Sequence, residues 1–124
     1  MKIALDAMGG DHAPRVNLEG ARDILAEDSE VEAIFLTGPT DRLKKAASEC
    51  GLTDPRAIFI EAPEVVGMDE SGAKALRRKK NSSISIAADL VKKGDAQALV
   101  SAGNTGAAVA TVTVKLRLLK GVQR

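Results

Sequence analysis

The chain alternates short apolar segments with longer amphipathic segments along its length, and this alternation limits the folds that are open to it. The short segments are rich in Ile, Leu, Val and Ala, and the longer segments repeat apolar residues with the period of a helix. Helices that connect successive strands of one sheet make right-handed crossovers, so the strands run parallel. The sequence therefore predicts an α/β protein, a three-layer α/β/α fold with a mainly parallel sheet and helices on both faces. We expect strands at residues 2–5, 31–37, 57–61 and 97–100, and helices at residues 14–28, 39–50 and 82–93.

The composition agrees with this fold class. Hydrophobic residues make up 44% of the 124 residues, yet only two are Phe and none is Trp or Tyr, so aliphatic side chains must fill the core. The length suits one domain, and a net charge of +1 favours no class of partner. The sole cysteine, Cys50, excludes an internal disulfide, fits a reducing compartment and is expected to be a small core residue. No apolar run approaches the ~20 residues of a membrane span, and the first strand follows Met1 directly, so neither a membrane span nor a signal peptide is expected.

Each of the three expected helices presents one apolar face to the sheet. Gly51 is the expected cap of the second helix, and Gly94 follows the end of the third. The residues predicted to point inward are Val16, Ala21, Ile24 and Leu25 in the first helix, Leu43, Ala46, Ala47 and Cys50 in the second, and Ile84, Ala87, Ala88 and Val91 in the third.

The last segment carries two conflicting patterns. Residues 111–118 alternate polar and apolar side chains, as a strand does. Asn104, however, is typical of a helix start and Gly121 of a helix end, and the strand–helix rhythm requires a helix here. We therefore predict a helix.

Three unusual loops follow expected strands, at residues 6–14, 63–82 and 101–106. Because the carboxyl ends of parallel strands meet at one edge of a sheet, we expect these loops to face one another. In the first loop, Gly9 and Gly10 either let the backbone approach a ligand or form a plain tight turn. Asp6 and Asp11 could bind magnesium weakly, but turn chemistry explains them equally well, and no metal site is predicted.

The loop at residues 101–106 precedes the last expected helix, whose free amides and dipole would favour an anion. Ser101, Gly103, Thr105 and Gly106 are the candidate ligands there, and ordinary capping by Asn104 or Thr105 is the alternative. The loop is neither a Walker A loop nor a G-x-G-x-x-G turn.

A basic run lies in the second loop, and Lys74, Arg77 and Arg78 share a face if this run is helical. Such a run is usually a solvated surface. Here it leads to a helix start beside the other two loops, so an anion-binding role and a solvated surface are equally favoured. Nucleic acid is not an expected partner, because no aromatic residue is interleaved. The run continues through Lys79 and Lys80 to Ser82 and Ser83.

Two further expectations concern single features. His12, the only histidine, either carries a proton or contacts an anion, or else caps a turn. Residues 65–82 are expected to be the most mobile part of the chain, because they form a long loop with few apolar residues.

Three motifs together carry a resemblance to a known family. They are Asp6-Ala-Met-Gly-Gly-Asp11-His-Ala-Pro14, Ala75-Leu-Arg-Arg-Lys-Lys-Asn-Ser-Ser83 and Ser101-Ala-Gly-Asn-Thr-Gly-Ala107. In this order and spacing they resemble the bacterial phosphate acyltransferases of fatty acid and phospholipid synthesis, the PlsX family. Family chains are much longer, so the resemblance implies that these residues form the amino-terminal α/β lobe of a two-lobe enzyme, and the lobe alone is expected to be inactive.

The resemblance implies a reaction without a cofactor. Members transfer a fatty acyl group from acyl carrier protein to inorganic phosphate, which gives acyl phosphate. The implied fold resembles that of isocitrate and isopropylmalate dehydrogenases, and the implied state is a homodimer, cytoplasmic and peripherally associated with the membrane. His12 and Asn104 are then the catalytic candidates. The phosphate or substrate candidates are Gly9, Gly10, Asp11, Arg77, Arg78, Lys79, Lys80, Ser82, Ser83, Ser101, Gly103, Thr105 and Gly106.

Two alternatives from other classes remain at this point. One is a nucleotide-binding enzyme domain, which the fold permits but which lacks the phosphate-binding fingerprint after the first strand. The other is a non-catalytic lobe that only dimerises. Residues 111–118 also depart from the family, whose helix there is richer in Leu and Met.

Overall fold

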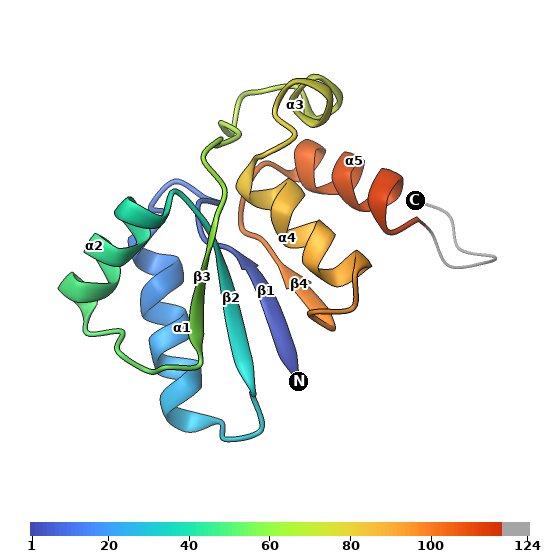
Figure 1. Ribbon diagram of the computed structural model, residues 1–124. Coiled ribbons are helices and arrows are strands. Elements are labelled where there is room, and N and C mark those ends of the chain that lie inside the picture. Colours follow the sequence, from blue (N-terminus) through green and yellow to red (C-terminus); the bar gives the residue numbers. More distant parts are fainter. Residues whose placement is uncertain (118–124) are drawn as a thin grey trace.

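The computed structural model describes residues 1–117, and its centre is a four-stranded parallel sheet (Figure 1). The strands are β1 (Lys2–Asp6), β2 (Ala33–Gly38), β3 (Ala57–Glu61) and β4 (Ala98–Val100). Their order across the sheet is β3-β2-β1-β4, and every neighbouring pair is parallel. The predicted parallel sheet is therefore confirmed.

Helices cover both faces of this sheet, as predicted. On one face lie α1 (Arg15–Glu27) and α2 (Thr40–Cys50); on the other, α4 (Ser83–Lys92) packs against β1 and β2, and α5 (Thr105–Lys115) packs beside α4 (Figure 1). The short α3 (Gly72–Arg78) packs on α5, beyond the carboxyl ends of the strands. The three layers are those of an α/β/α fold, whereas the likeness to the dehydrogenases stays a prediction.

Small aliphatic side chains fill the core on both sides of the sheet. The larger cluster lies under α1 and α2 and is built around Leu18, Leu36 and Leu43, which are completely buried. The smaller cluster, around Ala4 and Ala87, lets α4 approach the sheet closely. A chain with few aromatic residues reaches close packing in this way, because its helices can lie near the strands.

The helix boundaries and most of the inward faces agree with the sequence. Gly51 ends α2 with φ of 76°, and all four residues predicted to point inward from α2 are buried. The conflicting last segment is a helix to Lys115, as predicted. The predicted helix end at Gly121 and the last position of the alternating pattern, Leu118, lie outside the described residues.

The prediction for the inward face of α1 was partly wrong. In α1, Leu18, Ala21 and Leu25 are buried, but Val16 is 56% exposed and Ile24 is 44% exposed. The reason is geometric: both side chains line an open hollow, together with residues of β1, β2 and β4, and no described helix closes it. None of the helices in residues 1–117 is both long enough and apolar enough to span a membrane.

Candidate functional site

A buried carboxylate joins the first and third of the predicted loops at the carboxyl edge of the sheet. Asp6 ends β1 and is only 4% exposed. Its Oδ2 accepts a hydrogen bond of 2.8 Å from Ser101 Oγ, and its Oδ1 accepts one of 3.2 Å from the Met8 amide. Ser101 Oγ in turn accepts the Gly103 amide at 3.1 Å. The carboxylate thus fixes the loop after β4 against the loop after β1.

Glycines let the two loop backbones touch. A Cβ added to Gly9 would lie 2.7 Å from the Gly103 nitrogen, closer than any real Cβ contact, and one added to Gly103 would lie 3.1 Å from the Gly9 Cα. Gly10 has φ of 98°, a conformation that glycine adopts readily and other residues do not. These glycines therefore serve loop-to-loop packing, whereas their contact with a ligand stays a prediction.

Asn17 supports the first loop from α1, and the sequence analysis missed it. Its Nδ2 donates to the carbonyls of Ala7 at 2.9 Å and Gly9 at 2.8 Å. A single asparagine on an apolar helix face is the only signal that the sequence offers for this role. The donor holds the glycine turn at a fixed distance from the helix.

Asn104 brings the second loop into the cluster. Its Oδ1 accepts the Ala107 amide at 2.9 Å and so caps α5. Its Nδ2 lies within hydrogen-bond distance of three carbonyl oxygens, those of Gly67 at 2.9 Å, Met68 at 3.1 Å and Glu70 at 2.7 Å. The three loops therefore meet at one edge, as predicted. The side-chain amide of Asn104 is already engaged within the protein, and its predicted catalytic role stays a prediction.

The first turn of α5 is the part of this cluster best suited to an anion. Thr105 and Gly106 are exposed, and the Asn104 cap does not use their amides. Gly72 of α3 packs so closely that a Cβ there would lie 2.3 Å from the Gly106 carbonyl group. Behind the loops, a small, partly open cavity of about 10 Å³ has room for about one water molecule. An anion would thus approach from outside.

One residue of the basic run, Lys79, is already paired within the protein. Lys79 Nζ donates to Glu70 Oε1 at 2.5 Å and to the Val65 carbonyl at 2.7 Å. The hydrogen bond from Lys79 to the Glu70 carboxylate, helped by one from the Gly67 amide, lowers the pKa of Glu70. Arg77, Arg78 and Lys80 are exposed, and Arg78 lines a surface hollow of about 240 Å³ together with Lys74, Lys79 and Glu70. In the described part of the chain, α3 therefore presents an exposed cationic surface.

The remaining candidates have less suitable positions. Ser82 and Ser83 are buried, and Ser82 Oγ caps α4 by accepting the Ser85 amide at 3.2 Å. His12 and Asp11 are exposed in the turn before α1. Across residues 1–117, no three His, Cys, Asp or Glu side chains gather as a metal site requires.

Comparison with known proteins places the chain among longer enzymes. The model of a family described as "fatty acid synthesis protein" matches residues 1–124. The whole chain is 56% identical to a phosphate acyltransferase of Akkermansia muciniphila, 50% identical to one of Desulfitobacterium hafniense and 45% identical to one of an Exiguobacterium species. It covers 36%, 36% and 37% of these relatives, respectively, or little more than a third of their length.

Proposed function

The chain belongs to the fatty acid synthesis protein family, and from this membership we propose that it supplies one wall of the active site of a phosphate acyltransferase. The proposed reaction transfers a fatty acyl group from acyl carrier protein to inorganic phosphate. The proposed site is the edge where the loops of Gly9 and Gly103 meet in front of α5. We further propose a homodimer, a peripheral position on the cytoplasmic membrane face, and a second lobe that closes the site.

One observation carries the proposal: the contact of the Gly9 and Gly103 backbones beside the first turn of α5. The amides of Gly9 and Gly103 already donate to the Asp6 carbonyl and to Ser101 Oγ, so the proposed anion donors are the amides of Thr105 and Gly106, which this contact helps to fix. Backbone amides fixed in this way bind an anion without losing side-chain entropy, and the helix dipole adds to the attraction. The Asp6–Ser101 hydrogen bond supplies that rigidity. The buried charge at the contact itself is the Asp6 carboxylate, which Ser101 and the Met8 amide engage, so phosphate is proposed to bind on the outer side of the loops, at the exposed Thr105 and Gly106.

The chemistry asks little of the protein besides positioning. Phosphate is a competent nucleophile near neutral pH, and its oxygen attacks the thioester carbonyl carbon. A C–O bond forms, the tetrahedral intermediate collapses, the C–S bond breaks and the thiolate leaves with its electron pair, then takes up a proton. Backbone donors that favour the developing oxyanion and hold both reactants close are sufficient for this reaction. His12, in the exposed turn, is proposed to orient phosphate or to accept a proton.

The cationic surface of α3 suits the other substrate. Acyl carrier proteins are acidic, and a basic rim raises the rate of encounter with an acidic partner. Arg77, Arg78 and Lys80 are exposed beside the loop cluster and are proposed to meet the carrier protein. Lys79, which Glu70 neutralises, is proposed to hold α3 in place.

The test uses a full-length fusion in which this chain replaces the matched part of the Akkermansia muciniphila relative. Incorporation of labelled phosphate into acyl phosphate is expected for the fusion and not for the 124-residue chain alone. Gly103→Leu should lower turnover of the fusion at least about a hundredfold, because it separates the loops. The control Ser48→Leu, on the outer surface of α2, should not. Normal turnover of Gly103→Leu would remove this edge from the site, and turnover by the chain alone would refute the need for a second wall.

A further inference from the structure

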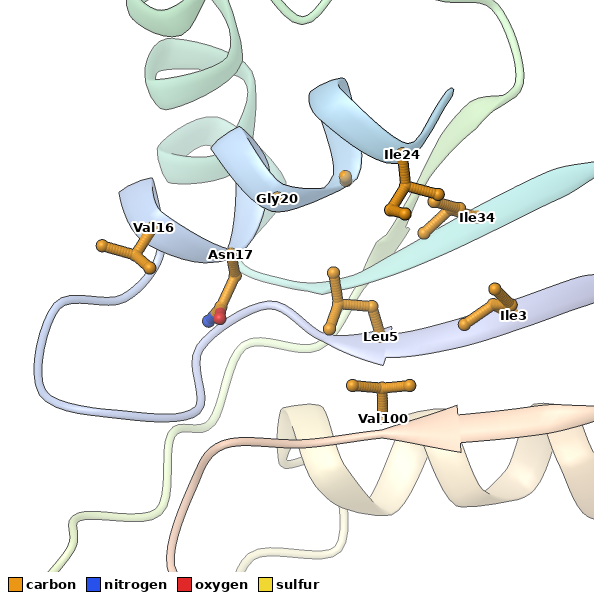
Figure 2. A pocket seen from close by; sticks show the side chains of 9 residues that line it. Ile3, Leu5, Val16, Asn17, Gly20, Ile24, Ile34 and Val100 are labelled. Carbon is orange, nitrogen blue, oxygen red and sulfur yellow. The ribbon is translucent and has the colours of Figure 1, made fainter. Parts of the chain in front are cut away.

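An apolar groove of about 300 Å³ lies on the α1 side of the sheet, away from the loop cluster's polar groups. Figure 2 shows the side chains of Ile3, Leu5 and Val100 on the strands and Ile24 above them on α1, and Val16 lines the groove at the start of the same helix. Its one polar lining residue, Asn17, uses its amide on the first loop. The sheet forms the floor and α1 forms one wall, but the described residues supply no opposite wall.

The apolar side chains of this groove are more exposed than is usual on a covered face of a parallel sheet. Val16, Ile24 and Val100 are 56%, 44% and 49% exposed, and all three line the groove. Single exposed apolar residues are normal, but a contiguous apolar patch marks a surface that another part covers. The apolar face of α1 is also wider than the part that packs on the sheet, which indicates that it serves two contacts.

The strand beside the groove, β4, also has an unpaired edge among the described residues. Within residues 1–117, β4 pairs with β1 alone, so its other edge is unpaired there. Parallel sheets occur with both faces covered, because their strands are apolar on both sides. On the side of α4, Leu99 packs in the smaller core cluster, whereas on the side of α1, Val100 stays 49% exposed among the described residues.

The helix that follows β4 cannot provide this cover. α5 packs beside α4, on the opposite side of the sheet from the groove (Figure 1). A right-handed crossover on that side carries the chain onward in the direction from β3 to β4, so a parallel strand after α5 would lie beyond β4. Neither α5 nor a strand that follows it would therefore lie on the open side of the groove.

We propose that this groove is the docking surface for an amphipathic helix from the polypeptide that the relatives carry beyond the matched region. The matched region is 36% of the Akkermansia muciniphila relative, so ample polypeptide remains to supply such a helix. The helix lies against β4 beside α1, with its apolar stripe on Val16, Ile24 and Val100, and completes the layer that α1 and α2 begin. This inference depends on the fold and the family, and not on the proposed reaction.

Thiol protection tests the proposal without any assay of activity. Ile24→Cys and Val100→Cys are placed in the 124-residue chain and in the full-length fusion, whose other added cysteines are replaced; Cys50 is buried and stays as an unreactive reference. The control is Ser48→Cys, a nearly isosteric change on the exposed side of α2. Both groove thiols should react with a soluble thiol reagent at least about tenfold more slowly in the fusion than in the chain. The control thiol should react equally in both.

Three outcomes would overturn the proposal. Equal reactivity in both proteins would leave the groove open. If the groove thiols of the 124-residue chain react more slowly as the protein concentration rises, the occupant is a second copy of the chain. Protection in the fusion only after addition of a long-chain acyl phosphate would make an acyl chain the occupant.

A second variant covers the case in which folding itself is affected. Val100→Asp should leave the urea midpoint of the chain nearly unchanged, because Val100 is already half in water. In the fusion the same change buries a carboxylate under the helix, so the midpoint should fall or the fusion should fail to fold. An equal effect in both proteins would contradict the docked helix.

Discussion

The contact between Gly9 and Gly103 makes the sharpest prediction for a single residue. Gly9→Ala would place a Cβ 2.7 Å from a backbone nitrogen that cannot rotate away, so the loops must separate. We expect the free energy of unfolding of the 124-residue chain to fall by roughly 1–3 kcal/mol. Urea denaturation followed by circular dichroism measures this change.

Gly20→Ala is the matched control. Gly20 lies inside α1 and a Cβ there meets nothing within 4 Å. The same change in chemistry should raise the free energy of unfolding by roughly 0.5–1 kcal/mol, because alanine restricts the unfolded chain. A loss of stability for both variants would show that the glycine contact between the loops is not the cause.

Arg56 ties the start of β3 to the end of α1, and its partner Asp54 makes this link depend on pH. The Arg56 guanidinium donates to the carbonyls of Asp28 at 3.1 Å and Val31 at 2.9 Å and to both carboxylate oxygens of Asp54. The side-chain hydrogen bond from Arg56, together with the Arg56 amide, lowers the pKa of Asp54 below its ordinary value of 3.8. A carboxyl group whose pKa is lower in the folded state stabilises the fold above its unfolded pKa, and this stabilisation is lost as the pH falls through the folded pKa.

Asp54→Asn should therefore destabilise the chain most at neutral pH. The difference in urea midpoint between the native chain and the variant should be constant above about pH 5 and shrink as the pH falls below about 4. Measuring the difference cancels the titration of the other carboxyl groups. A difference that does not change between pH 7 and pH 2 would contradict the lowered pKa.

At the scale of elements, Asn104 holds two structures at once. Its oxygen caps α5, and its amide nitrogen holds the loop that leads into α3. Asn104→Asp keeps an acceptor for the Ala107 amide but places a carboxylate against carbonyl oxygens. We expect α5 to persist and α3 to be released, so that hydrogen exchange accelerates at residues 72–79 and not at residues 108–115.

Asn104→Ala separates the two roles. It removes the cap as well, at a cost of about 1 kcal/mol, so exchange should accelerate in both α3 and α5. The same pattern of exchange for the two variants would mean that the cap alone carries the effect of this residue. These measurements also test the predicted mobility of residues 65–82, because α3 lies within them.

The helices and strands were predictable, because periodicity and helix caps depend on residues that are close together in the sequence. The four strands and the cap at Gly51 follow from such signals, and the parallel direction of the strands follows from their alternation with helices. The meeting of the three loops was also predictable, since parallel topology alone brings them to one edge. The exposure of Val16 and Ile24 was not, because an apolar helix face does not reveal which part of the protein covers it.

The site was less predictable than the fold. The hydrogen bond between Asp6 and Ser101 joins residues at opposite ends of the chain, and in the sequence Asp6 is equally explained by turn chemistry. Asn17 stands out in the sequence only as a polar residue on an apolar helix face, which does not identify the glycine turn as its partner. Residue types predicted which loops matter, whereas the partners of each side chain depended on three-dimensional structure.

At the scale of the whole molecule, charge is balanced overall and concentrated locally. The net charge is +1, so no long-range field guides a partner to the chain as a whole. Arg77, Arg78 and Lys80 nevertheless stand exposed together near α3. Such a patch acts over about a Debye length, roughly 10 Å at 0.1 M salt, so its effect on an acidic partner should depend strongly on salt.

Arg78→Ala in the full-length fusion tests which substrate meets this patch. If it steers the carrier protein, KM for the acyl carrier protein substrate should rise by up to about tenfold at low salt, with KM for phosphate and kcat little changed. Added salt should raise the same KM in the unmodified fusion and reduce the difference between the two proteins. Arg42→Ala removes an equal charge from the exposed side of α2 and should have little effect. A rise in KM for phosphate that salt does not reproduce would instead assign Arg78 to the bound phosphate, because a contact ion pair at the site is screened far less than a distant surface charge.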